Sequence, residues 1–127
     1  MRSAFEYAII RVVPHVEREE FLNVGVVLFS PKAELLVARL ELDEARLLAL
    51  ASDADLEVVR THLAAIAHVC AGTTDAGAIA ALSQRERFQW LVSPRSTILQ
   101  TSSPHGGVMD DVETTLSRIM QTMVRAP

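Results

Sequence analysis

Residues 7–29 have the sequence YAIIRVVPHVEREEFLNVGVVLF, and this stretch decides the fold. It predicts two β-strands, at residues 5–13 and 22–29, joined by a short charged turn. Both strands are apolar on both faces, which is typical of strands in the middle of a sheet that is covered on both sides. Pro14 has no N–H to donate to a strand ladder, so it ends the first strand. The hairpin therefore predicts the core of a sheet and says little about chemistry.

The rest of the chain predicts one more hairpin strand, then helices. Residues 34–40 follow the hairpin closely enough to complete an antiparallel meander. The clearest helix covers residues 56–71, where apolar residues recur at spacings of three and four before Gly72 ends it. The other predicted elements are a short helix at 43–50, a helical turn at 78–82, a short helix or strand at 85–92, a strand at 96–102 and a helix at 111–124. Asp110, with Glu113 three residues on, resembles a capping box for the last helix.

These elements predict an α+β fold: a mostly antiparallel sheet, made of the N-terminal three-strand meander plus a later strand, with packed helices. A length of 127 residues suits a single domain spanning residues 1–127, with a sizeable core.

Composition and charge argue against several classes of protein. A net charge of −4 and an aromatic content of 5% disfavour a nucleic-acid-binding surface. No run approaches the roughly 20 apolar residues of a membrane span. Glu6 and Arg11 interrupt what would be the apolar region of a signal peptide. Cys70 is the only cysteine, so an internal disulfide is excluded. We therefore expect a cytoplasmic protein that binds neither nucleic acid nor membrane.

Polar side chains concentrate in residues 94–107, PRSTILQTSSPHGG. One interpretation is an anion-binding wall or a loop that supplies a general base. The other is an edge strand whose Ser and Thr side chains face water, followed by an ordinary turn. The following helix opens with Asp110 and Asp111, which would repel a phosphate, and no glycine-rich phosphate loop is present.

Arg11 and Asn23 are polar interruptions of the two central strands. A buried guanidinium needs a partner, because an isolated charge in a low-dielectric interior is costly. Arg11 either extends to the rim of the sheet or pairs with an acidic residue: Glu6, Glu19 or Glu20. Alternatively, Arg11 and Asn23 converge with Arg95 on one pocket. The candidate binding residues are then Arg11, Asn23, Arg95, Ser96, Thr97, Gln100 and His105.

No catalytic residue, metal site or cofactor is predicted. Ser102 and Ser103 lie near His105 in the chain, but no nucleophile-elbow motif accompanies them. Cys70 falls on the apolar stripe of its helix, which favours a buried, unreactive thiol. The four histidines show no metal-binding spacing.

Two segments, YAIIRVVP…EREEFLNVGVVLF and RFQWLVSPRSTILQTSSPHGG…DDVETTLSRI, resemble bacterial proteins grouped as domain of unknown function 3037. The resemblance covers nearly the whole chain. It implies a bacterial protein without assigned catalytic residues. Members are often encoded beside a kinase-like protein of the HipA type, which implies a partner or regulator of such a kinase. Gly106 and Gly107 replace a turn of the His-Thr-Gly kind, which weakens a role for His105.

Two functional hypotheses follow. The first is a non-enzymatic binding or regulatory protein that works as a homodimer or with a kinase-like partner, through an exposed edge strand or an apolar helix face. The second is a small-molecule-binding protein or enzyme whose polar pocket is built by residues 94–107.

Overall fold

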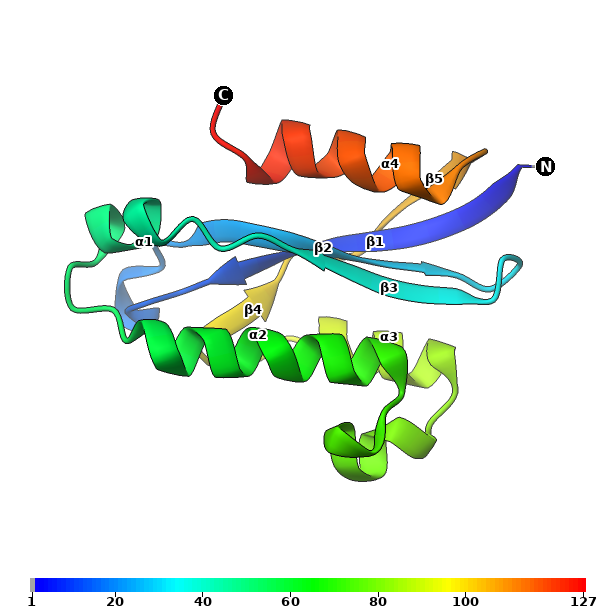
Figure 1. The fold of residues 1–127 in the computed structure, drawn as a ribbon, viewed down its shortest axis with the longest axis horizontal. Coiled ribbons are helices and arrows are strands. Elements are labelled where there is room, and N and C mark those ends of the chain that lie inside the picture. Colours follow the sequence, from blue (N-terminus) through cyan, green and yellow to red (C-terminus); the bar gives the residue numbers. More distant parts are fainter. Residues whose placement is uncertain (1) are drawn as a thin grey trace.

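A five-stranded antiparallel sheet lies between two helical layers in the computed structural model, which describes residues 2–127 (Figure 1). The α4 helix covers one face, and α2 and α3 cover the other. The strands are β1 (Ser3–Val12), β2 (Leu22–Ser30), β3 (Leu35–Leu40), β4 (Leu99–Thr101) and β5 (His105–Met109). The α-helices are α1 (Glu44–Leu50), α2 (Leu56–Ala71), α3 (Gln84–Val92) and α4 (Val112–Ile119). Two 3-10 segments, η1 (Val16–Arg18) and η2 (Thr74–Ala81), and a π-helical turn, η3 (Met120–Val124), complete the chain.

The predicted α+β class and the N-terminal meander are confirmed. The sheet has the order β3-β2-β1-β4, with β5 also paired to β1, so the first hairpin forms its centre. The bounds of α2 agree with the prediction, and Gly72 ends this helix at a positive φ of 69°. Residues 84–92 form a helix rather than a strand, because Ser83 and Glu86 make a capping box at its start.

The outer edge of β1 holds a strand pair that differs from the prediction. The strand predicted at residues 96–102 is only Leu99–Thr101. Gly106 and Gly107, which follow it, lie inside β5 and not in a turn. Both β4 and β5 pair with β1, one after the other along the same edge. Ile10 and Tyr7 are three positions apart in β1, whereas their pairing partners, Thr101 and His105, are four positions apart. The extra residue makes a β-bulge between β4 and β5.

Side-chain hydrogen bonding stabilises this bulge. Ser102 donates its backbone N–H to the Ile9 carbonyl (2.9 Å), and Ser102 Oγ accepts the Ile9 N–H (2.8 Å). The serine hydroxyl thus takes the place of a strand carbonyl where the ladder is interrupted. Pro104, two residues after Ser102, has no backbone N–H to donate to the ladder.

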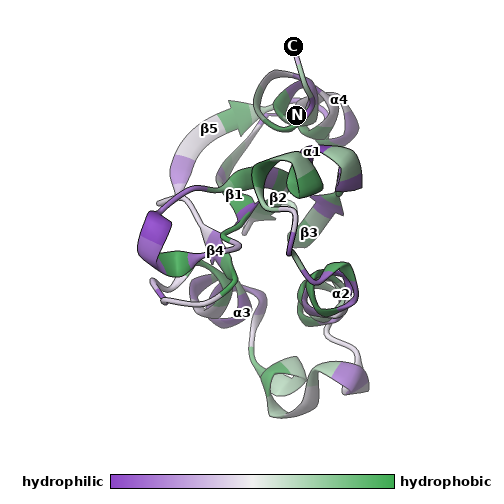
Figure 2. Ribbon diagram, turned by 90° about the vertical axis from the view of Figure 1, so that its left-hand side faces the viewer, coloured by the Kyte–Doolittle hydropathy of each residue, from purple (hydrophilic) through white to green (hydrophobic). Residues whose placement is uncertain are grey.

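Alternation along β1 divides the core into two parts. Phe5 and Ile9 face α4, whereas Ala8, Ile10 and Val12 face α2 and α3. Figure 2 shows the two helical layers on opposite sides of the sheet. Since both faces are covered, both sets of strand side chains are buried, which explains the nearly continuous apolar sequence of β1 and β2.

The buried Arg87 connects α3 to the end of α2. Its guanidinium donates to the carbonyls of Val69 (2.7 Å) and Cys70 (2.8 Å) and to that of Leu82 (3.1 Å). The last carbonyls of a helix lack partners within the helix and carry partial negative charge. The positive charge of Arg87 is therefore satisfied inside the core, and the two helices are held at one end.

The α4 helix and its N-cap each begin one residue later than predicted. Asp111, rather than Asp110, is the N-cap and accepts the backbone N–H of Thr114 (2.9 Å). The exposed Asp110 instead lies 3.7 Å from Arg2.

Candidate functional site

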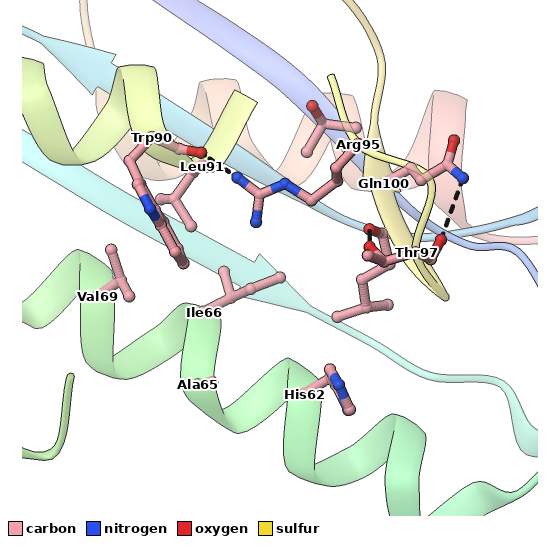
Figure 3. A pocket seen from close by; sticks show the side chains of 11 residues that line it. His62, Ala65, Ile66, Val69, Trp90, Leu91, Arg95, Thr97 and Gln100 are labelled. Carbon is pink, nitrogen blue, oxygen red and sulfur yellow. Dashed lines mark hydrogen bonds between the residues drawn. The ribbon is translucent and has the colours of Figure 1, made fainter. Parts of the chain in front are cut away.

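An apolar pocket opens between α2, α3 and β4 (Figure 3). Its volume is about 130 Å³. Aliphatic side chains line its interior: Ile66 and Val69 from α2, Leu91 from α3 and Leu99 from β4. Polar side chains from two separate parts of the chain complete the lining: His62, Arg95, Thr97, Gln100 and Thr101. We call this hollow the Trp90 pocket, after the aromatic residue that also lines it.

Arg95 and Trp90 form a pair at this pocket. The Arg95 guanidinium carbon lies 4.7 Å from the centroid of the Trp90 ring, within reach of a cation–π interaction. Its Nε donates to the Ser93 carbonyl (3.3 Å), and Nη2 donates to the Trp90 carbonyl. An arginine side chain has five N–H donors, so these bonds leave others free for a ligand. Trp90 is 40% exposed, although it belongs to a helix that packs on the core.

A second hollow lies beside the first, and we call it the Arg11 hollow. Its volume is about 260 Å³, and its lining residues are Arg11, Val13, Val16, Glu19, Phe21, Ser96 and Gln100. The Arg11 guanidinium carbon lies 4.0 Å from the centroid of the Phe21 ring. Within residues 2–127, Arg11 forms no ion pair with any of the acidic residues expected as partners: Glu6, Glu19 and Glu20. Its Nε is buried and has no hydrogen-bond partner among the described residues.

Gln100 connects these hollows. It lines both of them and also a third hollow, of about 330 Å³, that runs from Pro94 along Arg95 to the β4–β5 bulge. In the sheet, Gln100 is the register partner of Arg11. The segment that was expected to build a pocket therefore contributes to three adjoining hollows at the β4 edge.

The structure brings together some of the predicted site residues and separates others. Arg95, Thr97 and Gln100 share the Trp90 pocket, and Arg11, Ser96 and Gln100 share the Arg11 hollow. The predicted convergence of Arg11 with Arg95 on one pocket is not observed, although Gln100 lies between them.

Asn23 and His105 line none of the three hollows. Asn23 Nδ2 donates to the Met123 carbonyl (2.9 Å) and so ties the end of η3 to the sheet. His105 pairs with Tyr7 in the β1–β5 ladder, and their ring centroids are 5.5 Å apart.

Two aromatic residues of these hollows, Trp90 and Phe21, were not among the predicted site residues. A signal for Trp90 was available. Phe88 and Leu91 of α3 are buried, and Trp90 falls between them, off the buried face. A large apolar residue outside the core stripe of a helix is a candidate contact residue. Phe21 has no such signal, because it adjoins a strand that is apolar except at Asn23 and so reads as part of that apolar run.

Cys70 adjoins Val69, a lining residue of the Trp90 pocket, on α2. Burial raises the pKa of the Cys70 thiol to about 12, although the nearby Arg87 opposes this shift. The thiol is therefore protonated at neutral pH and is a poor nucleophile. In the part of the chain that the structure describes, no three His, Cys, Asp or Glu side chains group as a metal site would require.

The chain is thus an α+β protein in which three hollows adjoin one another at the β4 edge of an antiparallel sheet. The family model "Protein of unknown function (DUF3037)" matches residues 7–124, and the chain belongs to this family. No curated protein and no solved structure matches it. Among residues 2–127, no single helix is long and apolar enough to cross a membrane; α2 and η2 reach that length only together, with a bend of 48° between them.

Proposed function

We propose that the protein is a non-enzymatic binding or regulatory protein of the bacterial cytoplasm, and that its Trp90 pocket contacts a partner protein. The observation that carries this proposal is the exposed Trp90 ring paired with Arg95 at an apolar pocket. Trp and Arg are the residue types most enriched among the side chains that dominate binding energy at protein interfaces. Both are held in place here before any partner binds, which lowers the entropy cost of binding.

The size and charge of the pocket indicate what the partner presents. A volume of about 130 Å³ with an aliphatic interior suits one apolar side chain rather than a large cofactor. The remaining donors of Arg95 favour an acidic residue beside that anchor. The partner surface thus combines an apolar side chain with a neighbouring carboxylate.

The family resemblance supports one kind of partner, a kinase-like protein of the HipA type. A second copy of this chain is the alternative partner, in which case the working form is a homodimer. A kinase-like partner predicts a complex of two different chains, whereas the homodimer contains two copies of this chain.

Affinity purification from the native host tests the proposal. We expect the tagged protein to retain a kinase-like protein in a one-to-one ratio, with the mass measured by light scattering and the components by mass spectrometry. Trp90→Ala should lower the retained amount by about tenfold or more, as loss of a central interface residue does. The matched control is Val108→Thr, which changes another exposed apolar residue, on β5. A strictly monomeric protein without a partner, or full retention by Trp90→Ala, would contradict the proposal.

The same pocket favours a second candidate function, the binding of a small apolar molecule. Its aliphatic interior and polar rim are the usual composition of ligand sites. Trp90 is the only tryptophan, so its fluorescence reports directly on occupancy of this pocket. A saturable fluorescence change with a small molecule, together with a protein that remains monomeric in lysate, would favour this candidate.

A further inference from the structure

We infer that Arg11, Ser96 and Gln100 form a carboxylate-binding site in the Arg11 hollow, which takes a single carboxylate attached to a small apolar body. This site is distinct from the Trp90 pocket, and the inference goes beyond the proposed partner binding. Only Gln100 lines both hollows.

Arg11 has a buried hydrogen-bond donor without an acceptor. This side chain is half-buried near the end of the central strand β1, and its Nε has no hydrogen-bond partner within residues 2–127. Two of the three nearby acidic side chains are engaged elsewhere: Glu20 pairs with Arg18 (2.6 Å), and Glu6 lies 3.9 Å from Arg85. The third, Glu19, lines the hollow but forms no ion pair with Arg11 among the described residues. A buried N–H that has lost water without gaining an acceptor is unfavourable. A carboxylate bound to Arg11 would supply an acceptor.

The position of the Phe21 ring against Arg11 also favours a carboxylate. The Phe21 ring lies 4.0 Å from the Arg11 guanidinium carbon, so one face of the guanidinium is covered by an aromatic ring. The N–H groups of a guanidinium lie in its plane and remain free when the face is stacked. A planar carboxylate can accept two of these N–H groups in parallel. Such bidentate, charge-assisted pairs are among the strong hydrogen bonds that arginine forms.

Two neutral groups complete the site. Gln100 is the register partner of Arg11, and its amide already donates one hydrogen to the Thr97 carbonyl (3.1 Å), which orients the group and leaves a second N–H. The Ser96 side chain lines the same hollow and is exposed, so its hydroxyl is available as a donor. Val13, Val16 and Phe21 supply the apolar walls.

The charge of the hollow selects the class of anion. Arg11 is the one basic side chain in its lining, and Glu19 lines it as well. A phosphate dianion carries up to twice the charge of a carboxylate, so the Glu19 carboxylate repels it more strongly. A singly charged carboxylate with an apolar body fits both the charge and the walls.

The test follows the Arg11 Nε–H signal of the full chain by ¹⁵N NMR. We expect added 3-phenylpropionate to shift this signal saturably, and the neutral 3-phenylpropanamide to leave it in place. Inorganic phosphate at the same concentration should shift it less. Arg11→Gln should weaken the affinity for 3-phenylpropionate by about tenfold or more, measured on the backbone signals of residues 96 and 100.

Arg18→Gln is the matched control, because Arg18 is exposed on the adjoining η1 segment and is paired with Glu20. It should bind the probe as the unchanged protein does. If Arg11→Gln does not fold, Ser96→Ala, which alters an exposed residue, should still weaken binding. An unmoved Arg11 Nε–H at saturating probe, or an equal shift with the amide or with phosphate, would overturn the inference.

The carboxylate belongs either to a small molecule or to an acidic side chain of a partner protein, and two further measurements separate these sources. If Arg11→Gln also loses the co-purified partner, the carboxylate is the partner's. If it keeps the partner but not the probe, the ligand is a small molecule. Trp90→Ala should leave the probe titration unchanged, so failure of the proposed partner binding and failure of this site give different results.

Discussion

At the scale of the residue, Gly107 shows how one missing side chain permits strand pairing. A Cβ atom at this position would lie 2.7 Å from Cζ and 2.8 Å from Cε1 of the buried Phe5 ring. We expect Gly107→Ala to lower the free energy of unfolding by about 1–3 kcal/mol, because the ring must move within a packed core. The measurement is urea unfolding followed by circular dichroism.

Gly106→Ala is the matched control in the same strand. The nearest atom to its Cβ would be the Phe5 carbonyl oxygen, at 3.8 Å. This variant should stay within about 0.5 kcal/mol of the unchanged protein. Equal losses for the two variants would show that glycine is needed at Gly107 for a reason other than the Phe5 contact.

Cys70 makes stability depend on pH in the alkaline range. The pKa of its thiol is raised by burial from 9.0 to about 12. Above pH 9, the unfolded chain releases this proton while the folded protein keeps it, so the contribution to stability is complete below pH 9 and falls as pH rises toward 12.

We therefore expect the stability difference between the unchanged protein and Cys70→Ala to decrease between pH 8 and pH 10.5, measured by urea unfolding. The folded protein should also resist alkylation at pH 8 and react once it is unfolded. A pH-independent difference together with rapid alkylation of the folded protein would contradict burial of this thiol.

At the scale of the element, the start of α4 depends on one carboxylate. Hydrogen bonds from the Thr114 side chain and backbone lower the pKa of Asp111 below its usual value of 3.8. The stabilisation by Asp111 is therefore present above pH 3.8 and is lost as pH falls through the lowered pKa. Asp111→Ala should lower the melting temperature at pH 7, and the difference should shrink under acid.

Asp110→Ala is the control for this prediction, since Asp110 is exposed and makes only the 3.7 Å ion pair with Arg2. It should change the melting temperature little, because exposed ion pairs contribute little. A larger effect at Asp110 than at Asp111 would mean that the helix begins as the sequence pattern predicted, one residue earlier.

At the scale of the whole molecule, the two cores on opposite faces of the sheet must form together. Leu116, Ile119, Met120 and Val124 are buried against one face. At about 1.5–3 kcal/mol for each fully buried side chain, they contribute about 6–12 kcal/mol. That sum matches the entire stability of a typical domain, about 5–15 kcal/mol.

Deleting residues 111–127 should therefore leave a chain that aggregates or binds a hydrophobic dye, as measured by light scattering and dye fluorescence. The control is deletion of residues 126–127, which are exposed. A folded, monomeric product of the longer deletion would mean that the α2 and α3 side of the sheet folds without the other layer.

Local pattern was sufficient for the elements that bury a periodic set of side chains. The meander follows from two strands that are apolar on both faces, and α2 follows from its apolar stripe and the terminal Gly72. These features depend on neighbours within a few residues. Residues 94–107, singled out for their polar side chains, contribute lining residues to all three hollows at the β4 edge.

The sequence by itself thus determined the class of fold, the central hairpin and the segment that carries the hollows. Tertiary structure alone decided that Gly106 and Gly107 form a strand, because the pairing partner lies about a hundred residues away in β1 and the fit depends on the Phe5 ring. It also decided that Arg11 stacks on Phe21 without an acidic partner. Contacts between distant residues depend on register and packing, and neither is encoded in the local periodicity of a chain.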